Sequence, residues 1–147
     1  MSVVMAILRM TGINTNLEAM LGSLVQPNPG TEQWIVGFII HLALGAIIAW
    51  IYAVGFEFAM QRSGPWVGGG LGLCHGLIAG LFMSGIPEMN PFGLPSYAPG
   101  AFLMNVTHYK LVGPLIFVLL HVLYGVVVGT LYGETIQHEH PLARRAV

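Results

Sequence analysis

Three long apolar stretches of the chain carry small residues or histidine at a strict spacing of four. They cover residues 34–57, 66–86 and 111–132. On a helix, residues four apart lie on one ridge, and ridges of small residues let helix backbones approach closely inside lipid. The ridges consist of Gly37, His41, Gly45, Ala49 and Ala53, then Gly68, Gly72, Gly76, Gly80 and Ser84, and finally Gly113, His121, Gly125 and Gly129. The pattern predicts a tightly packed bundle of transmembrane helices.

The composition supports a membrane location. Of the 147 residues, 55% are hydrophobic and only 7% are charged, whereas a soluble domain carries about 25% charged residues. Each stretch has roughly 21 to 24 residues, and ~20 residues cross a ~30 Å hydrocarbon layer. We therefore expect an all-α, polytopic transmembrane helix bundle with three full spans and a short N-terminal helical segment.

Breaks in the apolar pattern divide this single membrane domain. The apolar run 3–8 is too short to span, and residues 26–30 contain two prolines and a glycine that interrupt any helix. The expected parts are an N-terminal interfacial segment (1–32), span A (33–60), span B (66–86), an external connector (87–109), span C (110–133) and a cytoplasmic tail (134–147).

The basic residues predict the orientation and limit the partners. Arg62, Arg144 and Arg145 fall on one side of the predicted bundle, and Arg9 and Lys110 fall on the other. The positive-inside rule places the richer side in the cytoplasm. A formal net charge of −1 provides no basic surface for nucleic acid. The expected partners are the lipid bilayer and other membrane-protein subunits, or further copies of the chain.

Three histidines lie inside the predicted spans. His75 and His121 are both near the centre of their stretches and so share a depth near the bilayer midplane, whereas His41 lies ~7 Å from the centre of its own stretch at ~1.5 Å per residue. Ionisable side chains at such depth are expected to face the bundle interior, a cavity or a cofactor.

Three interpretations of these histidines remain open. Each imidazole can hydrogen-bond across a helix contact as a packing group. Alternatively, His75, His121 and His41 can bind a haem or pigment, because the neighbouring small residues would let a flat macrocycle approach the helix. The third interpretation is a metal site or proton path that includes Glu57, although pairing of Glu57 with Arg62 is the favoured expectation for that carboxylate.

The remaining predicted site residues are glycines, and they belong to helix packing. No nucleophile stands beside a base, and no phosphate-binding loop is followed by lysine, so catalytic activity of the chain's own is not expected. The glycines expected at helix contacts are Gly37, Gly45, Gly72, Gly76, Gly80, Gly125 and Gly129.

Four short motifs resemble those of small bacterial inner-membrane proteins of unknown function with four helices. They are the run NLEAMLGSLV from Asn16, a W-x6-H-x3-G pattern from Trp34, PW-x-GGG-x4-H-G from Pro65, and H-x2-YG-x3-G-x2-YG from His121. The resemblance implies a multi-pass protein of the bacterial inner membrane, with a complete first helix where this chain has only residues 1–9.

The expected function is that of an accessory or scaffold subunit in a larger membrane assembly. The polar mass outside the predicted spans is small, and the glycine ridges offer more contact surface than three helices use on one another. The alternatives are a histidine-ligated haem, pigment or metal protein in electron transfer, and a small oligomeric transporter.

Overall fold

The computed structural model describes residues 1–12, 16–83 and 112–139, and every element in these ranges is helical. The helices are α1 (Ser2–Met10), α2 (Leu17–Ser23), α3 (Thr31–Val54), the π-helical turn η1 (Gly55–Met60), α4 (Pro65–Met83) and α7 (Val112–Glu139). Three segments, Thr31–Met60, Pro65–Phe82 and Pro114–Gly133, are long and apolar enough to cross a membrane. The predicted transmembrane helix bundle with a short N-terminal helix is confirmed.

The helix bounds follow the predicted spans with one extension. α3 and η1 together cover span A, and α4 covers span B as far as Met83. α7 continues through Glu139, so residues 134–139 of the expected tail are helical. Neither proline nor glycine interrupts this extension, and Pro141 is the first helix breaker beyond it. The expected connector (87–109) lies outside the described residues.

Two local signals explain how the short elements begin and end. The Asn16 side chain caps α2 by accepting a hydrogen bond from the Ala19 backbone N–H at 3.3 Å. Gln61 and Gly64 both have positive φ, 50° and 114°, and so turn the chain between η1 and α4. Pro65 then starts α4, where its fixed φ suits the first helical position and its missing N–H is not needed.

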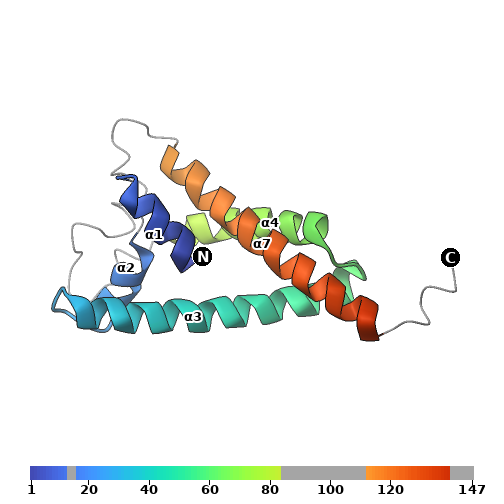
Figure 1. Cartoon of the computed structure of the whole chain (residues 1–147), viewed down its shortest axis with the longest axis horizontal. Coiled ribbons are helices and arrows are strands. Elements are labelled where there is room, and N and C mark those ends of the chain that lie inside the picture. Colours follow the sequence, from blue (N-terminus) through green and yellow to red (C-terminus); the bar gives the residue numbers. More distant parts are fainter. Residues whose placement is uncertain (13–15, 84–111, 140–147) are drawn as a thin grey trace, which may run out of the picture.

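The helices form an open arrangement with two close contacts (Figure 1). α3 lies along one side, α4 and α7 cross each other as an antiparallel pair, and α1 and α2 gather over the N-terminal half of α3. The two closest packings join α4 to α7 and α2 to α3. The core of the protein is therefore divided between these two contacts.

Glycine makes the α4–α7 contact a backbone-to-backbone one. A Cβ on Gly68 would collide with the carbonyl of Gly125, and a Cβ on Gly129 would collide with the carbonyl of Gly64. The Gly64 backbone N–H also donates a hydrogen bond to the Gly129 carbonyl at 3.0 Å. Gly72 meets the His121 carbonyl in the same way. The spacing of four on both helices thus produces the close approach that small residues permit in membranes.

The α2–α3 contact uses glycine as well, although its partner is a short helix rather than a span. Gly37 lies against the backbone of Glu18, and Gly22 lies against the backbone of Gln33. Gly45, one turn beyond His41, differs: within the described residues, no atom lies within 4 Å of the position a Cβ would take. Of the two glycines on the α3 ridge, Gly37 is therefore in close backbone contact and Gly45 is not.

Candidate functional site

One face of α3 and η1 carries the polar and aromatic groups that meet the other helices. Gln33, Gly37, Tyr52 and Phe56 on this face are buried, and His41 between them is half-buried. The spacing of about four residues keeps them on one drifting ridge. The ridge meets two polar groups of side chains, which we call the Glu18 cluster (Ser2, Arg9, Glu18 and His41) and the His–Tyr cluster (Tyr52, His75, His121 and Tyr124).

The His–Tyr cluster brings the two midplane histidines into direct contact. The ring centroids of His75 and His121 lie 4.7 Å apart with the planes at 89°, an edge-to-face arrangement. The Tyr52 hydroxyl lies 3.2 Å from Nδ1 of His75, and Nδ1 of His121 lies 2.8 Å from the Phe117 carbonyl. The shared depth predicted from the sequence is therefore accompanied by a shared position in the bundle.

These hydrogen bonds determine the protonation pattern of His121. A carbonyl oxygen only accepts hydrogen bonds, so Nδ1 of His121 must carry the proton and donate it to Phe117. In the neutral ring, Nε2 is then unprotonated and available to accept a proton. The Tyr52 hydroxyl can donate a hydrogen bond to Nδ1 of His75 or accept one from it, because a hydroxyl and an imidazole nitrogen can each be donor or acceptor.

The second tyrosine of the cluster connects α7 to the backbone of α3. The Tyr124 hydroxyl donates a hydrogen bond to the Gly45 carbonyl at 2.5 Å, and its ring lies 5.8 Å from that of Tyr52. This contact gives Gly45 a role in joining the two helices through its carbonyl, in place of the close backbone packing predicted for it.

The arrangement of the histidines does not fit a haem held between His75 and His121. A bis-histidine macrocycle requires the two rings on opposite sides of a plane, with the ligating nitrogens ~4 Å apart. Here the rings touch edge to face. The space beside Gly76 is already occupied by His121, since a Cβ atom on Gly76 would lie 2.9 Å from the Cβ atom of His121. Within the described residues, no group of three or more His, Cys, Asp or Glu side chains could hold a metal ion.

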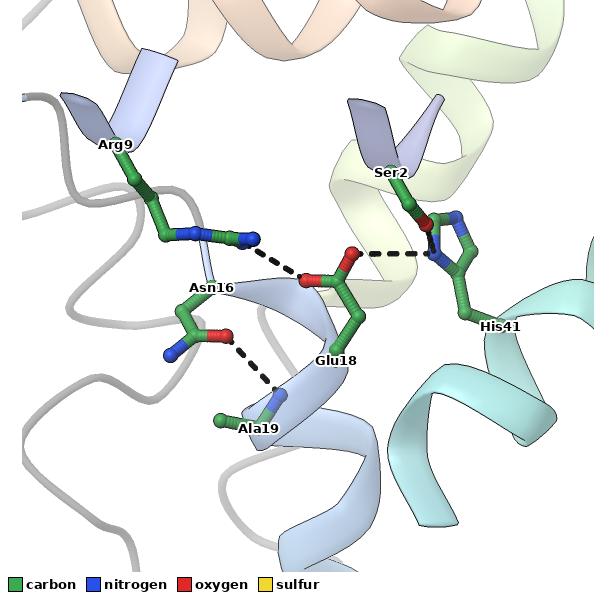
Figure 2. Close-up of polar contacts among 6 residues, drawn as sticks. All are labelled: Ser2, Arg9, Asn16, Glu18, Ala19 and His41. Carbon is green, nitrogen blue, oxygen red and sulfur yellow. Dashed lines mark hydrogen bonds and ion pairs between the residues drawn. The ribbon is translucent and has the colours of Figure 1, made fainter. Parts of the chain in front are cut away.

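The Glu18 cluster joins α1, α2 and α3 (Figure 2). Arg9 donates a hydrogen bond to Oε2 of Glu18 at 3.0 Å. On the other side, Oε1 of Glu18 lies 3.9 Å from Nδ1 of His41, which is 3.2 Å from the Ser2 hydroxyl. Glu18 has no exposed surface, and its Oε1 has no hydrogen-bond partner within the part of the chain that the structure describes.

The Glu18 cluster contains the residue types of a Ser–His–Glu triad but lacks its geometry. A triad requires the nucleophile on one imidazole nitrogen and the acid on the other. Here Ser2 and Glu18 both face Nδ1 of His41. The imidazole therefore cannot accept the hydroxyl proton at one nitrogen while the carboxylate holds the N–H of the other, and the cluster does not support nucleophilic catalysis.

Its surroundings keep the Glu18 carboxylate ionised. Burial alone raises the pKa of Glu18, but His41, the Glu18 backbone N–H, Ser2 and Arg9 together outweigh burial and lower the pKa to about 2. At 3.9 Å, His41 acts through electrostatic attraction rather than through a hydrogen bond. Glu18 thus carries a buried negative charge at neutral pH.

The predicted pairing of Glu57 with Arg62 is wrong. The Tyr132 hydroxyl donates a hydrogen bond to Oε1 of Glu57 at 2.6 Å, and Arg62 makes no ion pair within residues 1–12, 16–83 and 112–139. The wider π-helical turn η1 begins just before Glu57 and brings this end of the α3 segment against α7. The same turn buries Phe56, whose ring lies 5.3 Å from that of Tyr132.

Sequence reasoning missed the polar partners of the histidines. Tyr52 and Tyr124 lie deep in apolar spans, where a phenolic hydroxyl requires a hydrogen-bond partner, and this signal was present in the sequence. Arg9 at the end of α1 and Glu18 at the start of α2 form a pair of opposite charges on consecutive short helices. Nothing in the local pattern, however, showed that Glu18 would be buried, because its burial depends on partners from α1 and α3.

Comparisons with known proteins add no relative. No protein family, no curated protein and no solved structure matches the chain.

Proposed function

We propose that the protein is an accessory subunit of a larger assembly in the bacterial inner membrane, and that the outer face of α3 binds a transmembrane helix of a partner. The observation that carries this proposal is the side chain of Trp50, which is 68% exposed in the middle part of an apolar span.

The outer face of α3 lies opposite the ridge that meets the other helices. At ~100° per residue its members fall within an arc of ~80°. All of them are exposed. They are Ile39, Ala43, Ile47, Trp50 and Val54. Ala43 is the one small residue among them, two turns before Trp50, and it leaves room for a neighbouring helix to approach beside the large ring.

The depth of Trp50 favours a protein partner over lipid. Tryptophan normally occupies the membrane–water interface, where its N–H reaches water or headgroups. Trp50 lies ~7 Å from the centre of the Thr31–Met60 span at ~1.5 Å per residue, well inside the hydrocarbon. Its indole N–H makes no hydrogen bond within the described residues, although a buried indole normally finds an acceptor. A partner helix would provide that acceptor.

Site-directed photo-cross-linking in living bacterial cells tests this proposal. A photoreactive phenylalanine analogue is introduced at position 50 or, as a matched control, at Leu119, which is exposed on α7. We expect a protein adduct at position 50 and only lipid adducts at position 119. Replacement of Trp50 by Leu keeps the span apolar, and in mild detergent it should weaken the association that wild-type protein shows.

The masses of the adducts distinguish the alternatives. A heavier adduct of another membrane protein at position 50 supports the accessory role. An adduct of twice the mass of the chain indicates a second copy, which contradicts the accessory role and favours the small oligomeric transporter. Lipid adducts at both positions show that the outer face of α3 contacts only the bilayer.

A further inference from the structure

We propose that the bundle contains a proton pathway that enters at the Glu18 cluster, passes through His121, His75 and Tyr52, and is closed by the ring of Phe56. This proposal rests on the ridge of α3 that meets the other helices, and so it is independent of the partner proposed for the outer face.

The central part of this pathway consists of groups that can both accept and release a proton. His121 and His75 are in edge-to-face contact at 4.7 Å between ring centroids, and the Tyr52 hydroxyl lies 3.2 Å from Nδ1 of His75. Since Nδ1 of His121 is occupied by its bond to the Phe117 carbonyl, an arriving proton binds at Nε2. The contact between His121 and His75 is a ring contact rather than a hydrogen bond, so this transfer requires a bridging water molecule or the rotation of one ring. Each transfer then breaks one N–H or O–H bond and forms another, so the charge moves without any redox partner.

The entrance is the side of the bundle where α1 and α2 cover α3. His41 faces Ser2 from α1 and the ionised Glu18 from α2, with Arg9 on the far side of that carboxylate (Figure 2). Oε1 of Glu18, which has no hydrogen-bond partner within the described residues, lies 3.9 Å from Nδ1 of His41 and gives the entrance a negative charge.

The step from His41 to His121 is the longest in the pathway. Neither a hydrogen bond nor a ring contact joins the two imidazoles in the described part of the chain. A proton that moves between them therefore requires a bridging water molecule.

The ring of Phe56 separates this pathway from two further polar side chains, those of Tyr132 and Glu57. Its ring is 1% exposed and lies between Tyr52, at 6.3 Å between centroids, and Tyr132, at 5.3 Å. Beyond it, the Tyr132 hydroxyl is bonded to Glu57, which is exposed. A phenyl ring can neither accept nor release a proton, so this one apolar side chain separates the Tyr52 hydroxyl from the Tyr132 hydroxyl and Glu57.

Proton flux into proteoliposomes tests the pathway with the full-length chain. A pH-sensitive dye is enclosed, and a potassium gradient with valinomycin supplies the driving force. We expect Phe56→Ala to admit protons about tenfold faster than wild type, because the apolar barrier is removed. Phe58→Ala is the matched control, since Phe58 is 81% exposed on the same turn, and it should behave like wild type.

Two further variants, made in the Phe56→Ala background, distinguish a pathway from a leak. Tyr52→Phe removes a hydroxyl that contacts His75 and should return the flux to the wild-type rate. Tyr124→Phe removes a hydroxyl that is bonded only to a backbone carbonyl and should leave the flux unchanged. Retention of an enclosed anionic dye shows that the vesicles remain sealed.

Two results would overturn the proposal. The first is a Phe56→Ala flux no faster than that of Phe58→Ala. The second is a fast flux that Tyr52→Phe does not reduce, which would show a non-selective cavity. If the alanine variant does not give a monodisperse protein, Phe56→Leu opens a smaller gap and is tested with the same two background substitutions.

Discussion

At the scale of single residues, Glu18 shows how a charge is accommodated in a mostly apolar chain. Its carboxylate has no exposed surface, and a buried charge is stable only when it is paired or hydrogen-bonded. Arg9 supplies the ion pair from α1, and His41 supplies a second polar neighbour from α3. One side chain thus joins three helices, so its ionisation is linked to the docking of the N-terminal segment.

This linkage predicts a pH-dependent effect of Glu18→Gln. In the folded protein the pKa of Glu18 is lowered from 4.5 to about 2, so ionised Glu18 stabilises the fold fully above pH 4.5, and this stabilisation is lost as the pH falls toward 2. Glu18→Gln removes the ion pair and should cost about 1–3 kcal/mol near pH 7.

Thermal unfolding in detergent measures the difference between wild type and Glu18→Gln at several pH values. The difference should be constant from pH 7 to pH 5 and should shrink below pH 4.5. Glu32→Gln is the control, because Glu32 is exposed at the start of α3, and it should leave the unfolding temperature nearly unchanged. A wild-type advantage that persists unchanged near pH 2 would refute the linkage.

At the scale of elements, the α4–α7 pair depends on glycines that differ sharply in their surroundings. Gly125 lies against the backbone of Gly68, and Gly76 lies against the side chain of His121. Gly70 is on the same helix as Gly68, but within the described residues no atom lies within 4 Å of the place where its Cβ would be. The sequence shows the same residue at each position. The glycines differ in whether they face the other helix of the pair.

Leucine substitutions at these glycines should therefore have opposite outcomes. Gly125→Leu and Gly76→Leu place a large side chain where a backbone or an imidazole already lies, and such overpacking costs about 1–3 kcal/mol or more. Both variants should lose most of the monodisperse peak in size-exclusion chromatography. Gly70→Leu should retain it, and equal yields for all three variants would show that the glycine contact is unimportant.

The elements also show how much of the fold could be predicted. The three spans follow from length and hydropathy, and the close contacts at Gly72, Gly125 and Gly129 follow from a spacing of four. The docking of α2 does not follow, because the buried surface of that helix includes Glu18 as well as Met20 and Leu21. An apolar pattern cannot identify a buried acid whose counter-charge lies elsewhere in the chain.

The candidate site was predictable to a smaller degree. The sequence predicts that His75 and His121 lie at the same depth, and consecutive antiparallel helices pack side by side, so the proximity of the two histidines could be expected. The partners Tyr52 and Phe117 depend on side-chain direction and on how the helices are rotated against one another, which the spacing within one helix does not supply. The π-helical turn η1 also alters the helix phase at Phe56 and Glu57.

At the scale of the whole molecule, the three spans require the two ends of α3 to lie on opposite sides of the membrane. Asn28 precedes α3 and is exposed, and Ser63 follows η1. The positive-inside rule places Ser63, beside Arg62, in the cytoplasm. This orientation is a prediction from the distribution of basic residues.

Cysteine labelling with a membrane-impermeant reagent measures this orientation. In a background in which Cys74 is replaced by alanine, Asn28→Cys should react in intact cells, and Ser63→Cys should react only after the cells are permeabilised. The reverse labelling pattern would show that the orientation is inverted, while α3 would still cross the membrane once. Labelling of both positions in intact cells would contradict α3 as a single crossing.

The backbone contact between α4 and α7 has a mechanical consequence. Helices joined through glycine and through the hydrogen bond from Gly64 to Gly129 cannot slide or separate by small steps, so they move as one rigid body. α3 meets this body mainly through the tips of Tyr52, Tyr124 and Tyr132, and it is connected to it by the tight turn at residues 61–64. Among the described residues, this arrangement restricts rotation of α3 about that turn the least, and such a rotation would change every tyrosine hydrogen bond across the boundary in the same motion.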